Sequence, residues 1–258
     1  MTTGSGMRPD ERRKAIVTLV QNEKTVQVDE LAQRFDVSRM TVHRDLDWLE
    51  ERGLLRKDRG GATAESSLLF ESNYHFRSQI DLETKRAVAH AAAALIEPGH
   101  VIMIDDSTTT LQMCDELAEI EHITVISNSM AVWERLRSSP NVRLVMTGGN
   151  YADTLQACYG IMCEQALGRL RADWAFLSAP SVIGSALYHQ DQDVVRMKRA
   201  MMSSSDRSVL LLTAPKFSSR ALNHFADMTE FDRVFIGGKI SDETDKSLRK
   251  QGIPFEII

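Results

Sequence analysis

Along residues 28–50, apolar side chains recur with the 3.6-residue period of a helix in two short stretches separated by a tight turn. The inward positions are Leu31, Ala32 and Phe35 in the first stretch, and Val42, Leu46 and Leu49 in the second. Asp36 and Val37 make the turn, and Ser38 is a suitable N-cap because its hydroxyl can accept from first-turn amides. The pattern predicts a helix-turn-helix whose second helix projects from the surface.

The outward face of the second predicted helix carries groups suited to DNA. Its residues are Arg39, Met40, His43, Arg44 and Asp47. Cations near the N-terminal end of a helix with an apolar rear face are what a recognition helix needs in the major groove. Two amphipathic helices joined by a turn also occur in many all-helical domains, so the helices alone leave both interpretations open.

Residues 53–62 favour DNA binding. They supply a helix stop at Gly53, a short strand, and a Gly60–Gly61 turn beside Arg59. This pattern predicts a β-hairpin wing whose cation can contact the phosphate backbone or the minor groove. With a preceding helix over residues 12–20, the segment 8–63 is predicted to be a winged helix-turn-helix domain.

The predicted DNA contacts form two groups. Arg39, Thr41, His43 and Arg44 are expected at base edges in the major groove, and Ser38 and Arg59 on phosphates.

Three segments of this domain share a specific pattern. They are Val37-Ser38-x-x-Thr41-Val42-x-Arg44-Asp45-Leu46, Leu49-Glu50-x-x-Gly53-Leu54-Leu55 and Gly60-Gly61-Ala62. The pattern closely resembles the N-terminal domain of the DeoR family of bacterial transcription regulators. That family usually has arginine at the position of His43, a departure expected to alter base preference more than phosphate contact.

From Leu82 onward, near-continuous apolar strands alternate with helices. The predicted strands are 101–104, 123–126, 142–146, 174–177, 209–212, 234–236 and 255–258, and the predicted helices are 85–96, 109–118, 130–137, 160–170 and 193–203. Such alternation predicts a mostly parallel sheet with helices on both faces, an α/β domain over residues 81–258. Residues 64–80 lose periodicity and are predicted to be a linker, with an extended segment at 68–70.

Parallel sheets bind ligands at the carboxyl ends of their strands. Four predicted strand ends carry small, polar or hydroxyl residues, namely 105–110, 127–129, 147–150 and 213–217. The turn Ser107-Thr108-Thr109 opens a helix, so its hydroxyls and amides are suited to a phosphate, although simple helix capping is the favoured explanation of the turn taken alone. The convergence of four loops on one edge favours a ligand site.

Each residue of this expected site has a role. Ser107, Thr108 and Thr109 are expected on the phosphate, Lys216 or Lys198 as its cation, Gly148 and Gly149 at a close backbone approach, and Asp105 and Asn128 on a polyol.

The second domain also carries a recognisable set of motifs. They are Asp105-x-x-Thr108-Thr109, Asn128-Ser129, Gly148-Gly149, Gly160, Asp173, Lys198-Arg199-Ala200-Met201 and Lys216-Phe217. They resemble the DeoR-family sensor domain, which is related in fold to sugar-phosphate isomerases and CoA-transferases. The resemblance implies a repressor of carbohydrate-metabolism genes that is released by a phosphorylated sugar or a related metabolite.

The chain departs from that sensor pattern at several positions. Ser107 stands for the usual Gly, Val194 for a Glu, Thr213 for an Asp, Pro215 for a Ser, and Ile236-Gly237 for a Thr-Asp pair. The lost carboxylates remove acceptors for sugar hydroxyls, so an atypical ligand or weakened sensing is expected.

Composition and charge narrow the class of protein. The 258 residues are 43% hydrophobic and 26% charged, as in a soluble globular protein, and contain no bilayer-length apolar run. With no signal-peptide pattern over residues 1–6, a cytoplasmic location is expected. Three cysteines without C-x-x-C spacing argue against a disulfide framework or zinc site, and no metal or cofactor is expected.

The charge distribution suggests how DNA affinity is achieved. Residues 1–62 carry 12 Lys and Arg against 11 Asp and Glu, whereas the whole chain has a net charge of -5. A few placed cations, on more than one DNA-binding head, must then supply the affinity. A homo-oligomer, dimer or tetramer, held together by the α/β domain is therefore expected.

An enzyme is the alternative to a regulator. Asp105 and Asp106 have the chemistry of general bases in a sugar-phosphate isomerase-like reaction. They lack a His or Lys partner nearby in sequence, and a winged helix serves no purpose on a metabolic enzyme. The sequence therefore favours a regulator without enzymatic activity.

Overall fold

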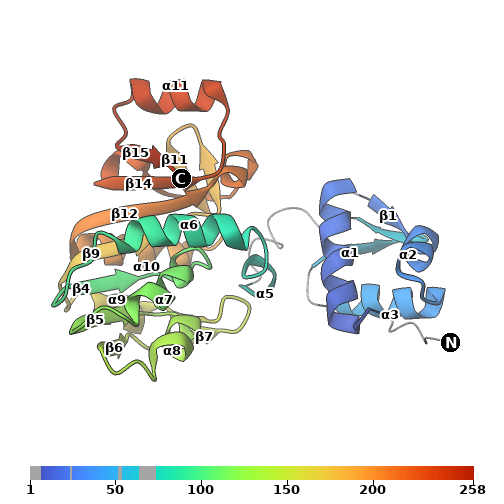
Figure 1. The fold of residues 1–258 in the computed structure, drawn as a ribbon, viewed down its shortest axis with the longest axis horizontal. Helices are drawn as coiled ribbons and strands as arrows, with labels where there is room; N and C mark the ends of the chain where they lie inside the picture. The colour runs from blue at the N-terminus through green and yellow to red at the C-terminus, as the bar shows by residue number, and fades with distance from the viewer. Residues whose placement is uncertain (1–6, 24, 52–53, 64–73) are drawn as a thin grey trace. The chain divides into compact units, whose positions relative to one another are not determined.

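The computed structural model describes residues 7–23, 25–51, 54–63 and 74–258, and these divide into two compact units, Met1–Phe76 and Arg77–Ile258 (Figure 1). The predicted helix stop at Gly53 and the predicted extended segment at 68–70 lie outside the described residues. The end of the predicted linker contains a short helix, α5 (Tyr74–Arg77).

The described part of the N-terminal unit has three helices and a small antiparallel sheet. The elements are α1 (Pro9–Glu23), β1 (Thr25–Gln27), α2 (Val28–Phe35), α3 (Arg39–Glu50), β2 (Arg56–Asp58) and β3 (Gly61–Thr63). β3 lies between β1 and β2 and pairs with both. Of the predicted inward residues, Leu31, Val42, Leu46 and Leu49 are buried, and Ala32 and Phe35 pack partly buried against the same core. The winged helix-turn-helix is confirmed.

The wing turn differs in detail from the prediction. The strand register pairs Asp58 with Gly61, so Arg59 and Gly60 form a two-residue turn. Gly60 has a φ of +89°, a left-handed conformation that favours glycine. Gly61 lies inside β3, where a Cβ would come within 2.1 Å of the Val26 carbonyl oxygen. Gly60 therefore serves the turn, whereas Gly61 lets β1 approach.

Residues 77–258 are built on a parallel sheet with seven described strands in the order β15-β14-β12-β9-β4-β5-β6. They are β4 (Val101–Ile104), β5 (Ile123–Ser127), β6 (Val142–Met146), β9 (Ala172–Leu177), β12 (Ser205–Thr213), β14 (Arg233–Gly237) and β15 (Phe255–Ile257). Every pairing between them is parallel. The predicted fold class is confirmed.

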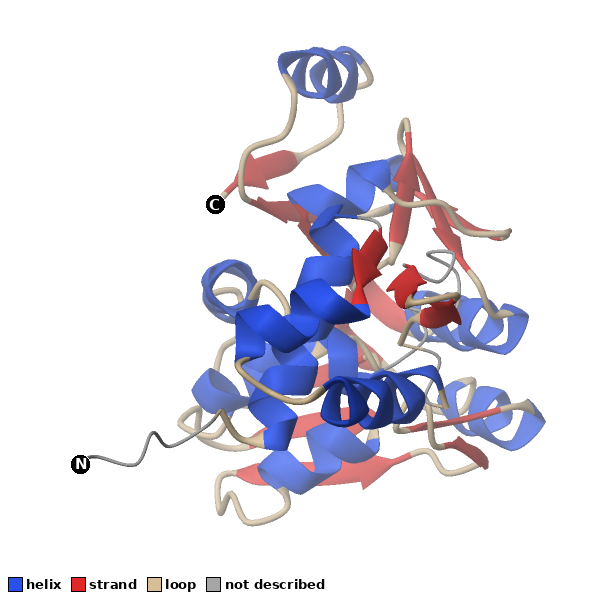
Figure 2. Cartoon of the chain, turned by 90° about the vertical axis from the view of Figure 1, so that its right-hand side faces the viewer, coloured by secondary structure: helices blue, strands red, loops and turns tan. Residues whose placement is uncertain are grey.

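Helices cover both faces of the sheet (Figure 2). They are α6 (Leu82–Ala93), α7 (Cys114–Leu117), α8 (Met130–Leu136), α9 (Ile161–Leu167), α10 (Gln192–Ser203) and α11 (Asp242–Lys250), with 3₁₀ segments η1 (Thr110–Met113), η2 (Ala214–Ser218) and η3 (Met228–Glu230). Leu210 and Leu212 of β12 pack with Met197 of α10, and α6 packs on β12 and β14 from the other face. Successive side chains of a strand point to opposite faces of the sheet, so β12 packs against helices on both faces.

Several short elements were not predicted. They are the hairpin β7 (Asn150–Ala152) and β8 (Ala157–Tyr159), the antiparallel sheet of β10 (Ser181–Ile183), β11 (Ala186–His189) and β13 (Asn223–Asp227), and helix α11. The strands have only three to five residues each, too few to show a clear period. Their pairing is set by tertiary contacts, which local periodicity does not reveal.

The predicted helix over 109–118 was wrong in form. Residues 110–113 are 3₁₀ and only 114–117 are α-helical. The Ser107 hydroxyl accepts from the Thr109 and Thr110 amides, and the Thr110 hydroxyl bonds to Asp105. These side-chain bonds hold the backbone in a tight turn and compete with a regular helix start.

The three cysteines, Cys114, Cys158 and Cys163, are buried free thiols, as the sequence indicates. Within the ranges that the structure describes, no helix combines the length and the apolar character needed to cross a bilayer.

Candidate functional site

The turn and cap that orient α3 are as the sequence predicts. Asp36 has a φ of 51°, a left-handed residue that ends α2 sharply. Ser38 Oγ accepts from the Thr41 amide at 3.1 Å and lies 2.9 Å from Thr41 Oγ1. The cap fixes the first turn of α3, from which the predicted base contacts project.

The outward face of α3 is open to solvent. Arg39 and Arg44 are exposed, and Met40 retains 63% of its surface. Arg39 Nε lies 2.8 Å from Asp29 Oδ1, and both side chains are about two-thirds exposed. Exposed ion pairs of this kind contribute little, about 0–1 kcal/mol, so Arg39 can exchange Asp29 for DNA at small cost.

The wing is attached to the same helix. The Lys57 amide donates to Glu50 Oε1 at 2.7 Å, and the Lys57 ammonium pairs with Asp47. Arg59 is exposed at the turn, where its amide donates to Asp58 Oδ1 at 2.7 Å. The wing therefore presents its cation beside α3.

A buried ion cluster that was not predicted from the sequence holds α1 against α3. Asp45 is 2% exposed and accepts from Arg12 Nε at 2.6 Å and from Arg13 Nε at 2.8 Å. The Arg13 guanidinium also lies over the Trp48 ring. A charged residue among the inward positions of a helix is the available sequence signal, because Asp45 precedes the buried Leu46.

In the C-terminal unit, Asp105 follows β4 at the carboxyl edge of the sheet and is completely buried. Its Oδ1 accepts from the Ser107 amide at 3.0 Å and from Thr110 Oγ1 at 2.6 Å. Its Oδ2 accepts from the Ser178 amide at 2.9 Å and from Lys198 Nζ. Because these four donors occupy the carboxylate, the geometry favours a role in positioning Lys198 over the expected polyol contact.

Asp106 has a different environment. It is 2% exposed, and its Oδ1 lies 3.6 Å from Lys198 Nζ without a hydrogen-bond partner. Burial raises the pKa of Asp106, but the charges of Lys198 and Arg77 outweigh burial and hold the pKa below its usual value. Asp106 is therefore a buried carboxylate that is paired with Lys198 and whose Oδ1 makes no hydrogen bond.

His189 and Tyr159 face this carboxylate. Burial, reinforced by Lys198, lowers the pKa of His189 to about 3. The ring is neutral, and since Nδ1 accepts from the Asp191 amide at 3.0 Å, Nε2 carries the proton and is a donor. Burial, followed by the Asp106 charge, raises the pKa of Tyr159 well above its usual value, so its hydroxyl keeps its proton.

The Ser107-Thr108-Thr109 turn is buried, and two of the amides expected to face a phosphate are already bonded. The Ser107 amide is bonded to Asp105, and the Thr109 and Thr110 amides are bonded to Ser107 Oγ. Ser107 thus acts as a cap, which was the alternative interpretation of the turn.

Cations gather beside Thr108. Lys85 of α6 is buried, and its Nζ lies 3.1 Å from Thr108 Oγ1 and donates to the Arg77 carbonyl. Burial, then the charges of Lys216 and Arg77, lower the pKa of Lys85 to about 7, against a smaller opposing effect of Asp81. Lys85 was not predicted, although it shares an inward helical face with buried Val88, Ala89 and Ala92.

Polar atoms without a partner mark the centre of the arrangement. Among the described residues, the buried ones include Arg77 Nε and Nη2, Asp106 Oδ1, Asn128 Oδ1 and the Tyr159 hydroxyl. Buried polar atoms are nearly always hydrogen-bonded, so this concentration indicates a place for a ligand or bound water. We call Arg77, Lys85, Asp105, Asp106, Asn128, Tyr159, His189 and Lys198 the carboxyl-edge cluster.

The remaining predicted site residues lie nearby with different functions. Asn128 Nδ2 donates to the Cys158 carbonyl at 3.0 Å, which orients its unpartnered Oδ1. A Cβ on Gly149 would come within 2.5 Å of the Tyr159 carbonyl oxygen, so this glycine serves packing against β8. Gly148 has open space at that position and a φ of +67°. Lys216 lies in η2 and is partly exposed.

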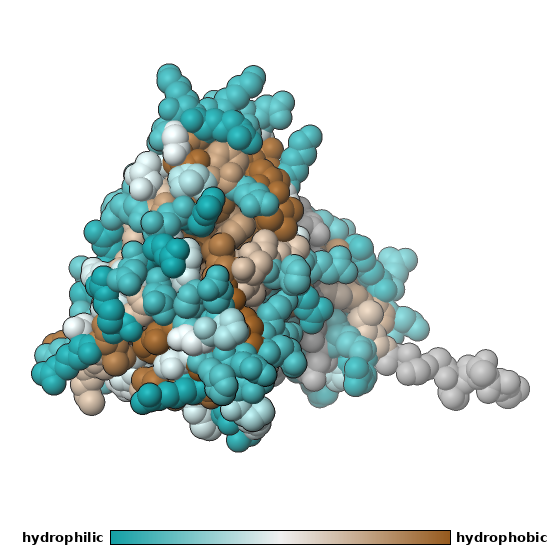
Figure 3. All heavy atoms as spheres, turned by 60° about the vertical axis from the view of Figure 1, so that its left-hand side comes forward, coloured by the Kyte–Doolittle hydropathy of each residue, from teal (hydrophilic) through white to brown (hydrophobic). Residues whose placement is uncertain are grey.

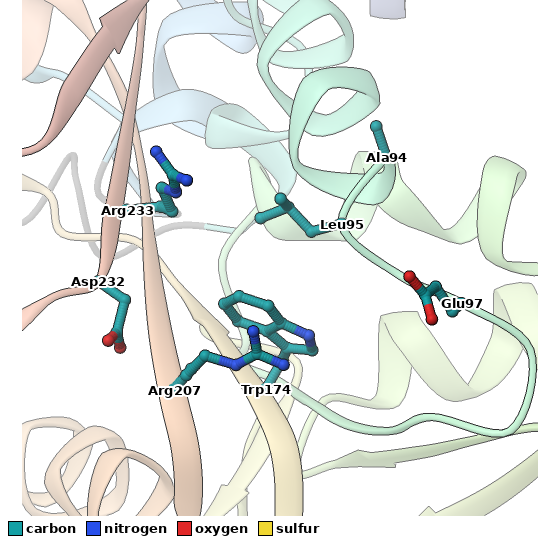
Figure 4. Close-up of a pocket in the computed structure, with 7 residues that line it drawn as sticks. All are labelled: Ala94, Leu95, Glu97, Trp174, Arg207, Asp232 and Arg233. Atoms are coloured by element: carbon teal, nitrogen blue, oxygen red, sulfur yellow. The ribbon is translucent and has the colours of Figure 1, made fainter.

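A cavity of about 480 Å³ lies away from the cluster, at the N-terminal ends of β9, β12 and β14 (Figure 4). The Arg207 guanidinium stacks on the Trp174 ring, 3.7 Å from its centroid. The lining opposes Arg207 and Arg233 with Glu97 and Asp232, so no ligand charge is favoured. None of the predicted site residues lines this cavity.

Two family matches account for most of the chain. Residues 12–68 match the DeoR-like helix-turn-helix domain, and residues 80–237 match the DeoR C terminal sensor domain. The chain belongs to the DeoR family of transcription regulators.

Relatives of this DeoR-family regulator cover nearly the whole chain. It is 29% identical to the putative aga operon transcriptional repressor of Escherichia coli O157:H7, over 96% of this chain and 93% of that protein. It is 30% identical to the L-fucose operon activator of Haemophilus influenzae, over 94% and 97%. Among solved structures, ribose 5-phosphate isomerase A of Methanocaldococcus jannaschii has a TM-score of 0.39 at 19% identity, over 53% of this chain and 54% of that one.

The matched domains locate the two candidate sites. The helix-turn-helix match contains α3 and the wing, and the sensor-domain match contains the carboxyl-edge cluster except Arg77, which lies between the two matches.

Proposed function

We propose that this regulator represses genes of carbohydrate metabolism and leaves its operator when a phosphorylated sugar or a related metabolite binds the sensor domain. The observation that carries the proposal is the set of buried, unpartnered atoms in the carboxyl-edge cluster. They include guanidinium donors of Arg77 and acceptor oxygens of Asp106 and Asn128. A phosphate needs such donors, and sugar hydroxyls need such acceptors.

The phosphate would lie beside Thr108. Arg77, Lys85 and Lys216 supply positive charge, and Thr108 supplies a hydroxyl. Near Thr108, the cationic side chains outnumber the carboxylates. Asp105 does not neutralise them, because it is already paired with Lys198. A phosphate monoester, mostly dianionic above pH 6, balances this excess.

The polyol would lie toward Asp106 and Asn128. Each has an unpartnered buried oxygen, and His189 Nε2 and the Tyr159 hydroxyl add donors. Asp106 takes the part first expected of Asp105. Val194 is buried in the core and Thr213 is 2% exposed, so neither replaces the carboxylates usual in the family.

DNA would be read by α3 and the wing. Arg39, Thr41, His43 and Arg44 would meet base edges, with Ser38 and Arg59 on phosphates. The exposure of Arg39, Arg44 and Arg59 supports this assignment.

The names of two relatives, an aga operon repressor and an L-fucose operon activator, support a carbohydrate operon as the target. Repression is the direction implied by the family resemblance.

We further propose a homo-oligomer assembled through the sensor domain. Its exposed apolar side chains, at least half accessible, are Tyr151, Ile161, Met162, Ile183 and Leu222. Figure 3 shows hydrophobic patches among hydrophilic side chains on the face it presents. Covering such residues in a dimer or tetramer would bring together more than one DNA-binding head.

Calorimetry with matched ligand pairs tests the effector class. Ribose 5-phosphate against ribose, and glucose 6-phosphate against glucose, isolate the contribution of the phosphate. We expect the phosphorylated form to bind at least tenfold more tightly and Thr108→Val to weaken it several-fold, whereas Thr229→Val, at an exposed site in η3, leaves it unchanged. Equal affinity for both forms would remove the phosphate from the proposal.

Substitution in α3 tests the DNA interface. We expect Arg44→Ala to lose about 1–3 kcal/mol of specific binding to a duplex selected by the wild-type protein from a random pool. Arg34→Ala, an exposed arginine of α2 paired with Glu23, is the matched control. An Arg39→Ala/Arg44→Ala protein that footprints like wild type would contradict the assignment of α3.

A further inference from the structure

Arg77 occupies a special position in the chain. It is the last residue of α5, the first residue of the C-terminal unit, and lies between the family matches that end at 68 and begin at 80. The chain arriving from the DNA-binding domain therefore enters the sensor domain at this residue. A contact that holds Arg77 therefore also restrains the peptide chain that connects the two domains.

The backbone of Arg77 is held by two groups of the proposed phosphate site. Its carbonyl oxygen accepts from Lys85 Nζ and from Thr108 Oγ1, the latter at 3.3 Å. Lys85 and Thr108 are both buried and lie 3.1 Å from each other. These two side chains therefore both donate a hydrogen bond to the first peptide of the sensor domain.

The side chain of Arg77, unlike its backbone carbonyl, has donors that make no hydrogen bond. Its Nε and Nη2 are buried without a hydrogen-bond partner. Its charge acts on Asp106, Tyr159 and His189 of the carboxyl-edge cluster and on Lys85 beside Thr108. A charged, buried donor pair in this state binds an anion readily because its desolvation has already occurred.

We propose that Arg77 couples effector binding to the DNA-binding domain by exchanging one set of contacts for another. A phosphate beside Thr108 takes the Arg77 guanidinium and competes for the Lys85 and Thr108 groups that hold the Arg77 carbonyl. The residue is held by its backbone without ligand and by its side chain with ligand. This inference rests on the proposed effector class.

The exchange satisfies the thermodynamic requirement for coupling. A ligand shifts an equilibrium between two arrangements only by making different contacts in each. Here the different contacts are named atoms at the entry to the sensor domain, so the ligand changes how the chain leaves that domain toward α3. Loss of Arg77 should therefore lower coupling as well as affinity.

The test measures coupling separately from affinity. For the full-length protein, the dissociation constant for a selected DNA duplex is measured without ligand and at saturating ribose 5-phosphate or glucose 6-phosphate, whichever binds wild type. The ratio of the two constants is the coupling factor. Arg77→Ala and the charge-conserving Arg77→Lys are compared with Arg86→Ala, an exposed arginine of α6.

We expect Arg77→Ala to bind the sugar phosphate about tenfold or more weakly and, even at saturation, to show a coupling factor near one. Arg77→Lys should recover part of the affinity with little coupling, and Arg86→Ala should behave as wild type. In the wild-type protein, the ligand should change amide hydrogen exchange over residues 74–85, which needs no variant to fold.

Two results would overturn the inference by different routes. A wild-type coupling factor in Arg77→Ala at saturation, or unchanged exchange over 74–85 on binding, would leave Arg77 a ligand at most and keep the proposed function intact. Failure of wild type to bind either phosphorylated sugar more tightly than its unphosphorylated form would overturn the effector class, and the coupling with it.

Discussion

The two domains bury charged groups for different purposes. In the DNA-binding domain, Asp45 is enclosed by Arg12 and Arg13 at 2.6 and 2.8 Å, and the cations proposed to meet DNA are exposed. In the sensor domain, Asp105 is equally enclosed, but its neighbour Asp106 keeps an unpartnered oxygen. Burial of a charge therefore does not mark a ligand site. The proposed ligand site rests instead on the unsatisfied atoms beside the buried charges.

The largest expected effect is the loss of stability when the buried ion cluster of Asp45, Arg12 and Arg13 is broken. Asp45→Ala leaves Arg12, which is 6% exposed, without its carboxylate, so we expect a loss of about 3–5 kcal/mol in the unfolding free energy of the DNA-binding domain. Denaturant-dependent hydrogen exchange over residues 9–50 reports that domain within the full chain. Asp47→Ala, which removes the half-exposed partner of Lys57, should cost less than about 1 kcal/mol. Equal losses would show that the cluster contributes no more than a surface pair.

An effect of intermediate size is expected on the pH dependence of sugar-phosphate binding at the carboxyl-edge cluster. The pKa of Lys85 is lowered to about 7 by burial and by the charges of Lys216 and Arg77, with Asp81 opposing. A bound phosphate favours protonated Lys85, so binding takes up a proton above pH 7. We expect sugar-phosphate affinity to fall as pH rises from 7 to 9, by up to about tenfold per unit. Calorimetry in buffers of different ionisation enthalpy measures the proton uptake.

Two variants control the pH experiment. Lys85→Met should flatten the profile, and Lys239→Met, at an exposed position, should preserve it. The same lowered pKa has the opposite effect on folding. Between about pH 7 and 10 the unfolded chain binds the proton and the folded chain does not, so the contribution of Lys85 to stability increases with pH. A flat affinity profile in wild type would separate Lys85 from the ligand.

The smallest expected effect compares two equivalent helix caps. Ser38 and Ser241 each accept from the amide three residues later at 3.1 Å, Ser38 at the start of α3 and Ser241 at the start of α11. Each Ser→Ala substitution should cost its own domain about 1 kcal/mol in calorimetric unfolding. Only Ser38→Ala should also weaken DNA binding, because α3 carries proposed DNA contacts and α11 does not. If Ser38→Ala binds DNA as tightly as Ser241→Ala does, Ser38 contacts no DNA phosphate and acts solely as a helix cap.

The DNA-binding domain was largely readable from the sequence. Ser38, Val42 and Leu46 lie where a 3.6-residue period and N-cap preference put them, since neighbours along a helix decide their environment. The turn at Gly60 shows the limit of this reasoning. Gly61 belongs to β3 because β1 approaches it, and the pairing partner is more than 30 residues away in the chain.

The sensor site was only partly readable. Because parallel strands end together, the prediction that residues after the strands share one edge holds for Asp105 and Asn128, which directly follow β4 and β5. It did not reveal that Asp105 is occupied by Lys198, 93 residues later. Asp105 and Asp106 have no His or Lys partner nearby in sequence, but folding brings Lys198 beside both carboxylates.

By itself, the sequence determined the helix-turn-helix, the alternation of strands and helices, and the family. These depend on periodicity, capping and local motifs, which act over a few residues. Tertiary structure decided which polar atoms are satisfied. Asp105 and Asp106 are adjacent and chemically identical, yet Asp105 accepts hydrogen bonds from Ser178 and Lys198, whereas Asp106 Oδ1 has only a longer ion pair with Lys198 at 3.6 Å. Hydrogen-bond satisfaction depends on partners that only folding brings within 3 Å, so it cannot be read from either residue's neighbours in the chain.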